Sequence, residues 1–268
     1  MKELTINLGT KSNEIEIVPL GDLHIGDPNC NIDLIKQTID YIANTKNCYC
    51  ILNGDLMNNA LKTSKSDSYL ETMPMEEQQE KLVELLYPIK DKILMLAQGN
   101  HEYRSSLLCG IDPLRYVARS LGLLEKGRYC TGAYLLTLLF GKRNGTDKLT
   151  NAYVVFGIHG GSGGGRRAGS TANALEDMNK IIPNADLYLH SHTHTQILYP
   201  DSIFIYNPMS KTLQRHYRTY YNTNSFLEYG GYAEMKGYKP TDTYPNVLRI
   251  RMIRDGGKMR KLTDVIRL

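Results

Sequence analysis

The sequence predicts an α/β fold made of two β-sheets with helices on the outside. Predicted strands and helices alternate in the first half of the 268-residue chain, and strands dominate its second half. Polar side chains of the kinds that bind metals directly follow five of the predicted strands. Since open α/β sheets bind their ligands at the carboxyl ends of strands, these side chains predict a functional site at that edge.

In the first half, short apolar runs predict strands and apolar residues at helical spacing predict helices. The predicted strands are 15–21, 49–53 and 93–98. The predicted helices are 32–45, 74–87 and 112–121, the last beginning with an Asp-Pro pair typical of a helix start. The tetrad Gly99-Asn100-His101-Glu102 is therefore predicted to lie in a loop, with helix beginning some ten residues later. The polar segment 58–72 is predicted to be a mobile loop.

In the second half, strands are predicted at 133–140, 152–158, 187–190, 203–206 and 247–253, with a turn at 141–145 and a helix at 171–181. The Gly-rich run 160–165 lacks the Gly-Lys-Ser/Thr ending of a nucleotide-binding loop, which excludes a Walker-type NTPase. Residues 216–245 are dense in Tyr and weakly periodic, and a basic tail covers 258–267. We expect one domain over 1–268, which the basic, Tyr-rich segment from about 208 to 268 completes or extends.

The composition is that of a soluble globular protein, with 41% hydrophobic and 22% charged residues. The longest apolar run, 133–140, is too short to span a bilayer, and the N-terminus lacks the features of a signal peptide. We therefore expect a cytoplasmic protein that does not interact with membranes. Its five cysteines are scattered and odd in number, which favours reduced, structural roles.

Positive charge is concentrated near the end of the chain. Residues 203–268 contain 12 Lys and Arg against 5 Asp and Glu, or +7, whereas the whole chain carries +4. The first 202 residues therefore carry −3. This asymmetry indicates a polyanionic partner such as nucleic acid. The alternative is an ordinary solvated surface.

Five of the seven histidines lie at the ends of predicted strands, together with two aspartates and an asparagine. Divalent metals that activate water favour this mixture of imidazole, carboxylate and amide ligands. The set therefore predicts a metal site. Its members are Asp22, His24, Asp55, Asn100, His101, His159, His192 and His194.

In their order and spacing, these motifs resemble those of the calcineurin-like metallophosphoesterase family, over roughly Val18 to Asn207. The motifs are Asp22-x-His24, Gly54-Asp55, Gly99-Asn100-His101-Glu102, His159-Gly160 and Ser191-His192-Thr193-His194. There are two departures. Ser191 stands where the family usually has Gly, and Ile158 precedes His159 where the family usually has Gly-His.

The resemblance implies a four-layer α/β/β/α sandwich of two mixed sheets and a two-metal site. Asp22, His24 and His194 would hold one metal, and Asn100, His159 and His192 the other. Asp55 would bridge the two metals, and His101 would lie beside the ester without binding metal. Two such cations can share a hydroxide that attacks phosphorus. Manganese is favoured, with iron, zinc or cobalt as alternatives.

Four further residues are candidates for supporting roles. Glu102 is placed to orient a neighbouring histidine. Arg104, Arg166 and Arg167 could bind a substrate phosphate, the last two from the end of the Gly-rich run.

These observations favour a phosphodiesterase or nuclease that acts on nucleic acid or nucleotides. A phosphomonoesterase, either a nucleotide or a protein phosphatase, is the first alternative. The second is a non-catalytic scaffold that binds nucleic acid or protein, but the intact set of ligands favours an enzyme. Homo-oligomerisation is left open.

Overall fold

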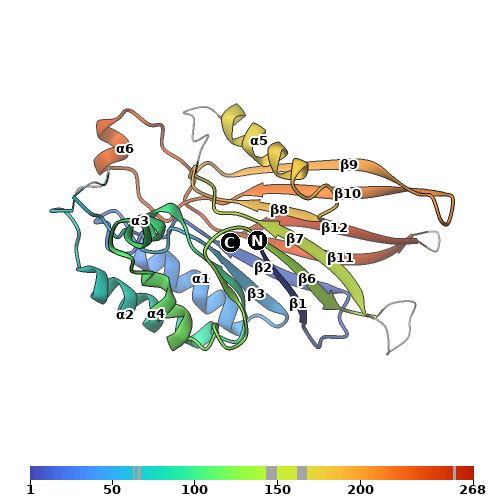
Figure 1. Cartoon of the computed structure of the whole chain (residues 1–268), viewed down its shortest axis with the longest axis horizontal. Coiled ribbons are helices and arrows are strands. Elements are labelled where there is room, and N and C mark those ends of the chain that lie inside the picture. The colour runs from blue at the N-terminus through green and yellow to red at the C-terminus, as the bar shows by residue number, and fades with distance from the viewer. Residues whose placement is uncertain (63, 65–67, 143–149, 162–167, 256–257) are drawn as a thin grey trace.

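The computed structural model describes residues 1–62, 64, 68–142, 150–161, 168–255 and 258–268. In these residues two six-stranded sheets pack against each other, and helices lie on the outer surface of each (Figure 1). Both sheets combine parallel and antiparallel strand pairs. The predicted four-layer α/β/β/α sandwich is confirmed.

We call the two sheets A and B. The strand order in sheet A is β1 (Lys2–Asn7), β6 (Tyr134–Phe140), β7 (Asn151–Gly157), β8 (Leu187–His190), β10 (Thr212–Asn222) and β9 (Ile197–Asn207). The strand order in sheet B is β12 (Lys258–Arg267), β11 (Asn246–Asp255), β2 (Glu14–Leu20), β3 (Cys48–Asn53), β4 (Ile93–Ala97) and β5 (Tyr129–Cys130). Segment 208–268 thus contributes strands to both sheets.

Sheet B is covered by α1 (Ile32–Asn44), α2 (Met75–Leu86) and α4 (Pro113–Ser120), and sheet A by α5 (Ala168–Asp177) (Figure 1). Helix α3 (Asn100–Cys109) follows β4, and the short α6 (Gly231–Met235) follows β10. Short 3₁₀ turns at Tyr87–Ile89 and Met178–Lys180 extend α2 and α5. In the part of the chain that the structure describes, no helix has the length and apolar character to span a membrane.

Three hydrophobic clusters fill the three interfaces between the four layers. Strand β2 shows how alternation supplies two of them. Ile15 and Ile17 face the other sheet, whereas Val18 and Leu20 face the helices. The apolar stripe of α1 packs on that helix side, where Cys48 and Cys50 are also buried. All five cysteines are free, as the sequence predicts.

Parallel pairing determines where the strand-end side chains go. Strands β2, β3 and β4 are parallel neighbours in sheet B, and β7, β8 and β10 are parallel neighbours in sheet A. Parallel neighbours end at the same edge of a sheet. The motif loops therefore meet at one edge of the sandwich.

The structure corrects several predicted boundaries. Helix α3 begins at Asn100, directly after the strand, so the tetrad 99–102 forms a helix start rather than a loop. The predicted strand 203–206 is part of a long hairpin of β9 and β10, and the basic tail is the edge strand β12. Strand β1 was missed because Ile6 is its one fully buried residue. Residues 143–145 of the predicted turn, residues 162–165 of the Gly-rich run and positions 63 and 65–67 of the predicted loop lie outside the described residues.

Candidate metal centre

Backbone contact between two glycines brings the loops after β3 and β4 together. A Cβ atom on Gly99 would lie 2.2 Å from the Asp55 nitrogen, and one on Gly54 would lie 2.6 Å from the Gly99 backbone. Such distances leave no room for a side chain at either position. Glycine at both positions therefore lets Asp55 and the start of α3 lie side by side.

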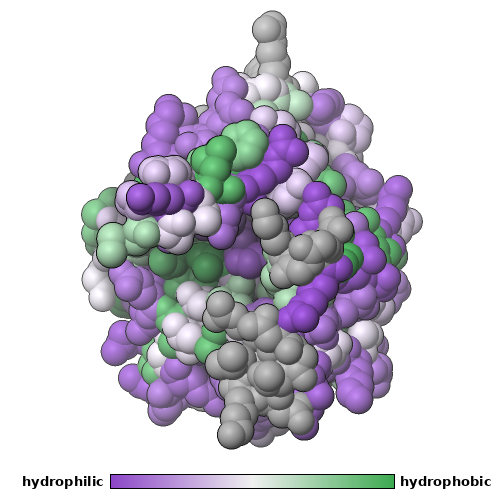
Figure 2. Space-filling view, turned by 90° about the vertical axis from the view of Figure 1, so that its right-hand side faces the viewer, coloured by the Kyte–Doolittle hydropathy of each residue, from purple (hydrophilic) through white to green (hydrophobic). Residues whose placement is uncertain are grey.

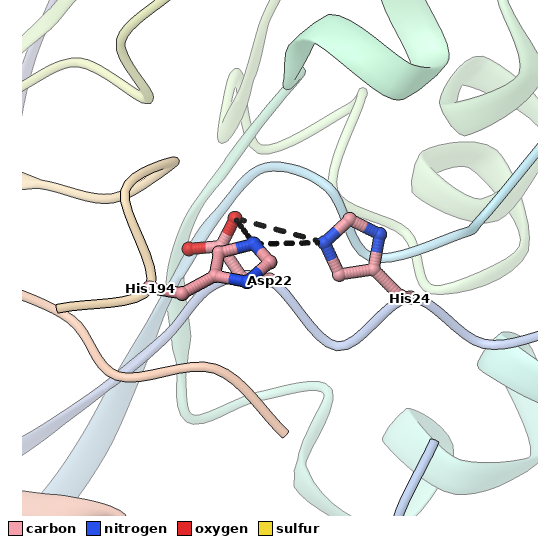
Figure 3. Close-up of side chains that lie close together, drawn as sticks. All are labelled: Asp22, His24 and His194. Atoms are coloured by element: carbon pink, nitrogen blue, oxygen red, sulfur yellow. Dashed lines mark hydrogen bonds and ion pairs between the residues drawn. The ribbon is translucent and has the colours of Figure 1, made fainter. Parts of the chain in front are cut away.

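One cluster of candidate ligands consists of Asp22, His24 and His194, which come from the loops after β2 and β8 (Figure 3). The two imidazole Nε2 atoms lie 3.2 Å apart. Asp22 Oδ1 lies 3.9 Å from His24 Nε2 and 3.4 Å from His194 Nε2. This oxygen is buried and accepts no hydrogen bond from the described residues. Two imidazole nitrogens thus converge on a carboxylate oxygen without a partner among those residues, which is the arrangement a bound cation would complete.

A second cluster consists of Asp55, His159 and His192. His159 Nε2 lies 3.1 Å from Asp55 Oδ2 and 3.1 Å from Asn100 Oδ1. Asn100, the first residue of α3, thus adds an amide oxygen to this cluster. The structure brings together all seven residues predicted as metal ligands.

Asp55 and His101 lie between the two clusters. A third group of ligand atoms joins Asp55 to His24 and His101, so Asp55 belongs to two groups. The His101 N–H donates to Asp55 Oδ1 at 2.7 Å, and His101 Nε2 lies 3.8 Å from Asp55 Oδ2. The His101 ring stands edge-on to His24, with centroids 4.5 Å apart. His101 therefore faces both clusters from the first turn of α3.

Backbone carbonyl groups orient two of the imidazoles. His159 Nδ1 lies 2.7 Å from the Asn53 carbonyl oxygen, and His101 Nδ1 lies 2.7 Å from the Asn58 carbonyl oxygen. A carbonyl oxygen can only accept, so each Nδ1 carries the proton. The Nε2 atom of each ring is then directed into the site, as is common for metal-binding histidines.

Five of the seven candidate ligands have the backbone in the left-handed region. Their φ angles are +54° for Asp22, +50° for His24, +51° for Asp55, +68° for His192 and +54° for His194. Positive φ is uncommon for residues other than glycine, and each such residue lowers the stability of the folded state. Strained backbone at so many strand ends is typical of a functional site, where side-chain direction is maintained at the expense of stability.

The electrostatics of the site suit a cation. Burial alone would raise the pKa of Asp55, but His159 and His101 hold that pKa well below its usual range. Burial opposes protonation of His159, yet the contact with Asp55 raises the pKa of His159 to about 10. Burial lowers the pKa of His24 well below its usual value. The site thus combines two carboxylates with lowered pKa values, Asp22 and Asp55, with a neutral imidazole at His24. His159 instead holds a proton beside Asp55, and a bound cation would take the place of that proton. Carboxylate and imidazole together are a donor set suited to divalent metals.

Glu102 hydrogen bonds to backbone groups of two loops. Its buried carboxylate accepts four backbone N–H bonds. Oε1 accepts from Leu56 at 2.7 Å and Met57 at 3.0 Å, and Oε2 accepts from Asp55 at 3.1 Å and Gly99 at 2.9 Å. Burial and the Asp55 charge raise its pKa to about 7, although the nearby charge of His159 acts in the opposite direction. Glu102 therefore fixes the loop that carries Asp55 to the start of α3.

Replacing Glu102 by Gln should destabilise the protein by roughly 1–3 kcal/mol, because the new NH₂ group would face two buried N–H donors that now share one oxygen. Urea unfolding of the protein without metal measures this change. Glu77→Gln, at an exposed position on α2, is the control and should change stability little. Equal stability of the two variants would contradict the role given to Glu102.

The three candidate substrate-binding arginines differ in what the structure shows of them. Arg104 lies one turn along α3 from His101 and donates to Ser64 Oγ. Burial lowers its pKa, while the charges of Asp55 and Glu102 act in the opposite direction. Arg166 and Arg167 lie outside the described residues.

Part of the positive charge near the end of the chain is neutralised in ion pairs. In the described part of segment 203–268, ion pairs join Arg218 with Asp201, Arg249 with Glu14 and Glu16, Arg251 with Asp264, Lys261 with Asp186, and Arg267 with Asp242. Figure 2 views the end of the molecule that carries the tip of the β9–β10 hairpin, where hydrophilic and apolar surfaces are mixed. The charge asymmetry is thus partly a matter of pairing within the fold.

Sequence reasoning missed several polar residues behind the ligands. Asn53, Ser191 and Thr223 are completely buried, and each hydrogen bonds to another polar side chain. One signal was available for Asn53, an amide at the end of the otherwise apolar strand β3. No signal was available for Thr223, which is 201 residues from its contact Asp22.

Comparisons with known proteins agree with this site. A model of the calcineurin-like phosphoesterase family matches residues 16–196, more than half of the chain. No curated protein matches the chain.

Two solved structures are similar over nearly the whole chain at low identity. One is a conserved protein of Streptococcus pneumoniae described as a predicted phosphoesterase, with 11% identity, 94% of this chain and 98% of that chain covered, and a TM-score of 0.36. The other is Vacuolar Protein Sorting 29 of Cryptosporidium parvum, with 12% identity, 95% and 99% covered, and a TM-score of 0.38.

The family match covers every loop that contributes to the two clusters, from Asp22 to His194. The chain therefore belongs to the calcineurin-like phosphoesterase family and is a metal-dependent hydrolase of phosphate esters.

Proposed function

We propose that the enzyme binds two divalent metal ions and hydrolyses phosphodiesters. Asp22, His24 and His194 would hold one ion, and Asn100, His159 and His192 the other. Asp55, which belongs to two of the three groups of converging ligand atoms, would bridge them. The observation that carries the proposal is that Asp55 groups both with His24 of the first cluster and with His159 and His192 of the second.

When bound, the two ions would supply an activated water and neutralise charge on the phosphate. The residues of this chain would do the rest. The buried carboxylates would fix the positions of the ions. Glu102 would keep Asp55 and α3 in register through its four amide contacts.

His101 would assist the departing oxygen. Its Nδ1–H bond to the Asn58 carbonyl leaves Nε2 facing the site, where it can hold a proton for the leaving group. Arg104, on the same side of α3, would bind a phosphate oxygen through its planar guanidinium group. Arg166 and Arg167 are proposed as further phosphate contacts on the basis of the sequence.

Manganese is the proposed metal, because the donor set of nitrogen and oxygen atoms contains no thiolate. Iron, zinc and cobalt suit the same donors. Nucleic acid or nucleotides are the proposed substrates, on the basis of the +7 charge of residues 203–268. The ion pairs within the fold reduce the share of that charge available for a substrate. We propose further that residues 1–268 act as one catalytic domain in the cytoplasm.

The proposal is tested by stripping the protein of metal, adding Mn²⁺ and comparing hydrolysis of bis-p-nitrophenyl phosphate with that of p-nitrophenyl phosphate. We expect Mn²⁺-dependent cleavage with preference for the diester. Preference for the monoester would show that the enzyme is a phosphomonoesterase. Absence of cleavage with Mn²⁺ bound would contradict the proposed reaction on both esters.

A further inference from the structure

We propose that Ser191 and Thr223 are positioning residues that hold the Asp22 carboxylate in place for the metal ion at the first cluster. This inference rests on the proposed role of Asp22 as a ligand. It concerns a chain of buried polar side chains that connects the two sheets beneath the site and ends on the Asp22 oxygen that points away from the histidines.

The series of contacts begins on a strand of sheet A and passes to a strand of sheet B. It then runs through two loops that follow strands of sheet A and ends at Asp22. The Tyr134 hydroxyl of β6 donates to Asn53 Oδ1 of β3 at 2.8 Å. Asn53 Nδ2 donates to Ser191 Oγ at 2.7 Å, and Ser191 follows β8. Thr223 Oγ1, which follows β10, lies 2.9 Å from Ser191 Oγ and 3.4 Å from Asp22 Oδ2. All of these residues except Asp22 lie outside the set of proposed ligands.

The Thr223 hydroxyl is the donor in both of its contacts. A hydroxyl carries one proton, so Thr223 donates it either to Ser191 Oγ or to Asp22 Oδ2. Ser191 Oγ accepts from Asn53 Nδ2 and from Thr223, which keeps the Thr223 side chain beside the carboxylate. The negative charge of Asp22 makes its oxygen the stronger of the two acceptors.

Asp22 is held on one oxygen only. Oδ2 accepts from the His192 N–H at 2.9 Å and from Thr223, whereas the buried Oδ1 has no hydrogen-bond partner in the part of the chain that the structure describes. Oδ1 is the oxygen nearer to His24 and His194. The contacts on Oδ2 therefore set the rotation of the carboxylate and leave Oδ1 available for a cation.

The hydroxyl pair also contacts the loop that carries Asp22. A Cβ on Gly21 would lie 2.6 Å from Ser191 Oγ and 3.1 Å from Thr223 Oγ1. The two oxygens thus press against the backbone directly before Asp22. Ser191 stands where the resemblance leads one to expect glycine, so the serine hydroxyl is a feature of this chain that links the contacts on either side of it.

The test measures Mn²⁺ binding by competition with a chelator, for the wild-type protein and for Thr223→Val, which removes the hydroxyl with little change of shape. We expect Thr223→Val to lower the affinity for one of the two Mn²⁺ ions roughly ten-fold, because substitutions of residues that support a metal ligand have effects of this size. The affinity for the other ion should be unchanged. Thr223→Ser, which keeps the hydroxyl, should restore the affinity. Ser191→Ala should lower the affinity for the same ion. It replaces Thr223→Val in the test if Thr223→Val does not fold.

Thr38→Val is the matched control, because Thr38 is equally buried but its hydroxyl donates to Leu34 within α1. Repeating Thr223→Val in an Asn100→Ala background, where the second cluster is weakened, assigns the affected ion. Equal loss of both ions, or behaviour like Thr38→Val, would overturn the positioning role. Failure of the wild-type protein to bind Mn²⁺ would instead overturn the proposed function and the inference with it.

Discussion

The Asp55→Asn variant is expected to lose both metal ions together. Asp55 Oδ2 lies beside His159, and Asp55 shares a ligand group with His24, so its charge serves both clusters. Asparagine keeps an acceptor for the His101 N–H but removes the negative charge between the ions. We expect activity to fall by more than about 100-fold, beyond the usual effect of changes behind a ligand.

Elemental analysis after gel filtration, combined with the diester assay, measures both effects. Asp91→Asn is a matched control, since Asp91 is an exposed aspartate paired with Lys126 on the surface. It should retain both ions and full activity. Two tightly bound ions in Asp55→Asn would contradict the bridging role.

The His101→Ala variant is expected to keep both ions but to lose turnover of esters with poor leaving groups. The imidazole faces the two clusters, and its proposed task is to protonate the departing oxygen without binding metal. Loss of a general acid typically lowers the rate by about 10²–10⁴-fold. The loss should be largest for a dinucleotide, whose alkoxide needs a proton, and smaller for a p-nitrophenyl ester, whose phenolate leaves readily.

This difference between two substrates separates a chemical role from a structural one, because misfolding would lower both rates alike. His216→Ala is the control. His216 lies on β10 and hydrogen bonds to the Ala185 carbonyl oxygen, away from the ligands. Metal loss from His101→Ala, or an equal loss of rate on both esters, would argue against the assigned role.

The start of α3 illustrates why part of the site escaped sequence reasoning. The sequence predicts a loop for the tetrad 99–102, because its residues are polar and the next clear helix signal is Asp112-Pro113. In the fold, helix starts at Asn100 because Glu102 accepts the Gly99 N–H in the first turn and also binds the loop after β3. A contact between residues 46 or 47 apart in sequence decided a local conformation.

Segment 203–268 is a case in which the sequence predicts more than the fold retains. Composition predicts a basic surface for residues 203–268. However, three of the cations that pair there do so with acidic residues outside that segment, namely Asp186, Asp201 and the Glu14–Glu16 pair. Composition counts charged residues but does not show which of them lie beside a residue of opposite charge. For this reason it overstates how much of that charge remains for a polyanionic substrate.

The sequence by itself determined two sheets with helices on the outside and the polar residues that follow the strands, whereas the four-layer arrangement was implied by the resemblance to the family. Strand and helix periodicity depend on local chemistry, and parallel strands deliver their end residues to one edge wherever the chain folds this way. Only the tertiary structure decided how those residues are supported. The four amides on Glu102 and the buried chain from Tyr134 to Asp22 join segments far apart in sequence, and such hydrogen bonds depend on distances that no local pattern specifies.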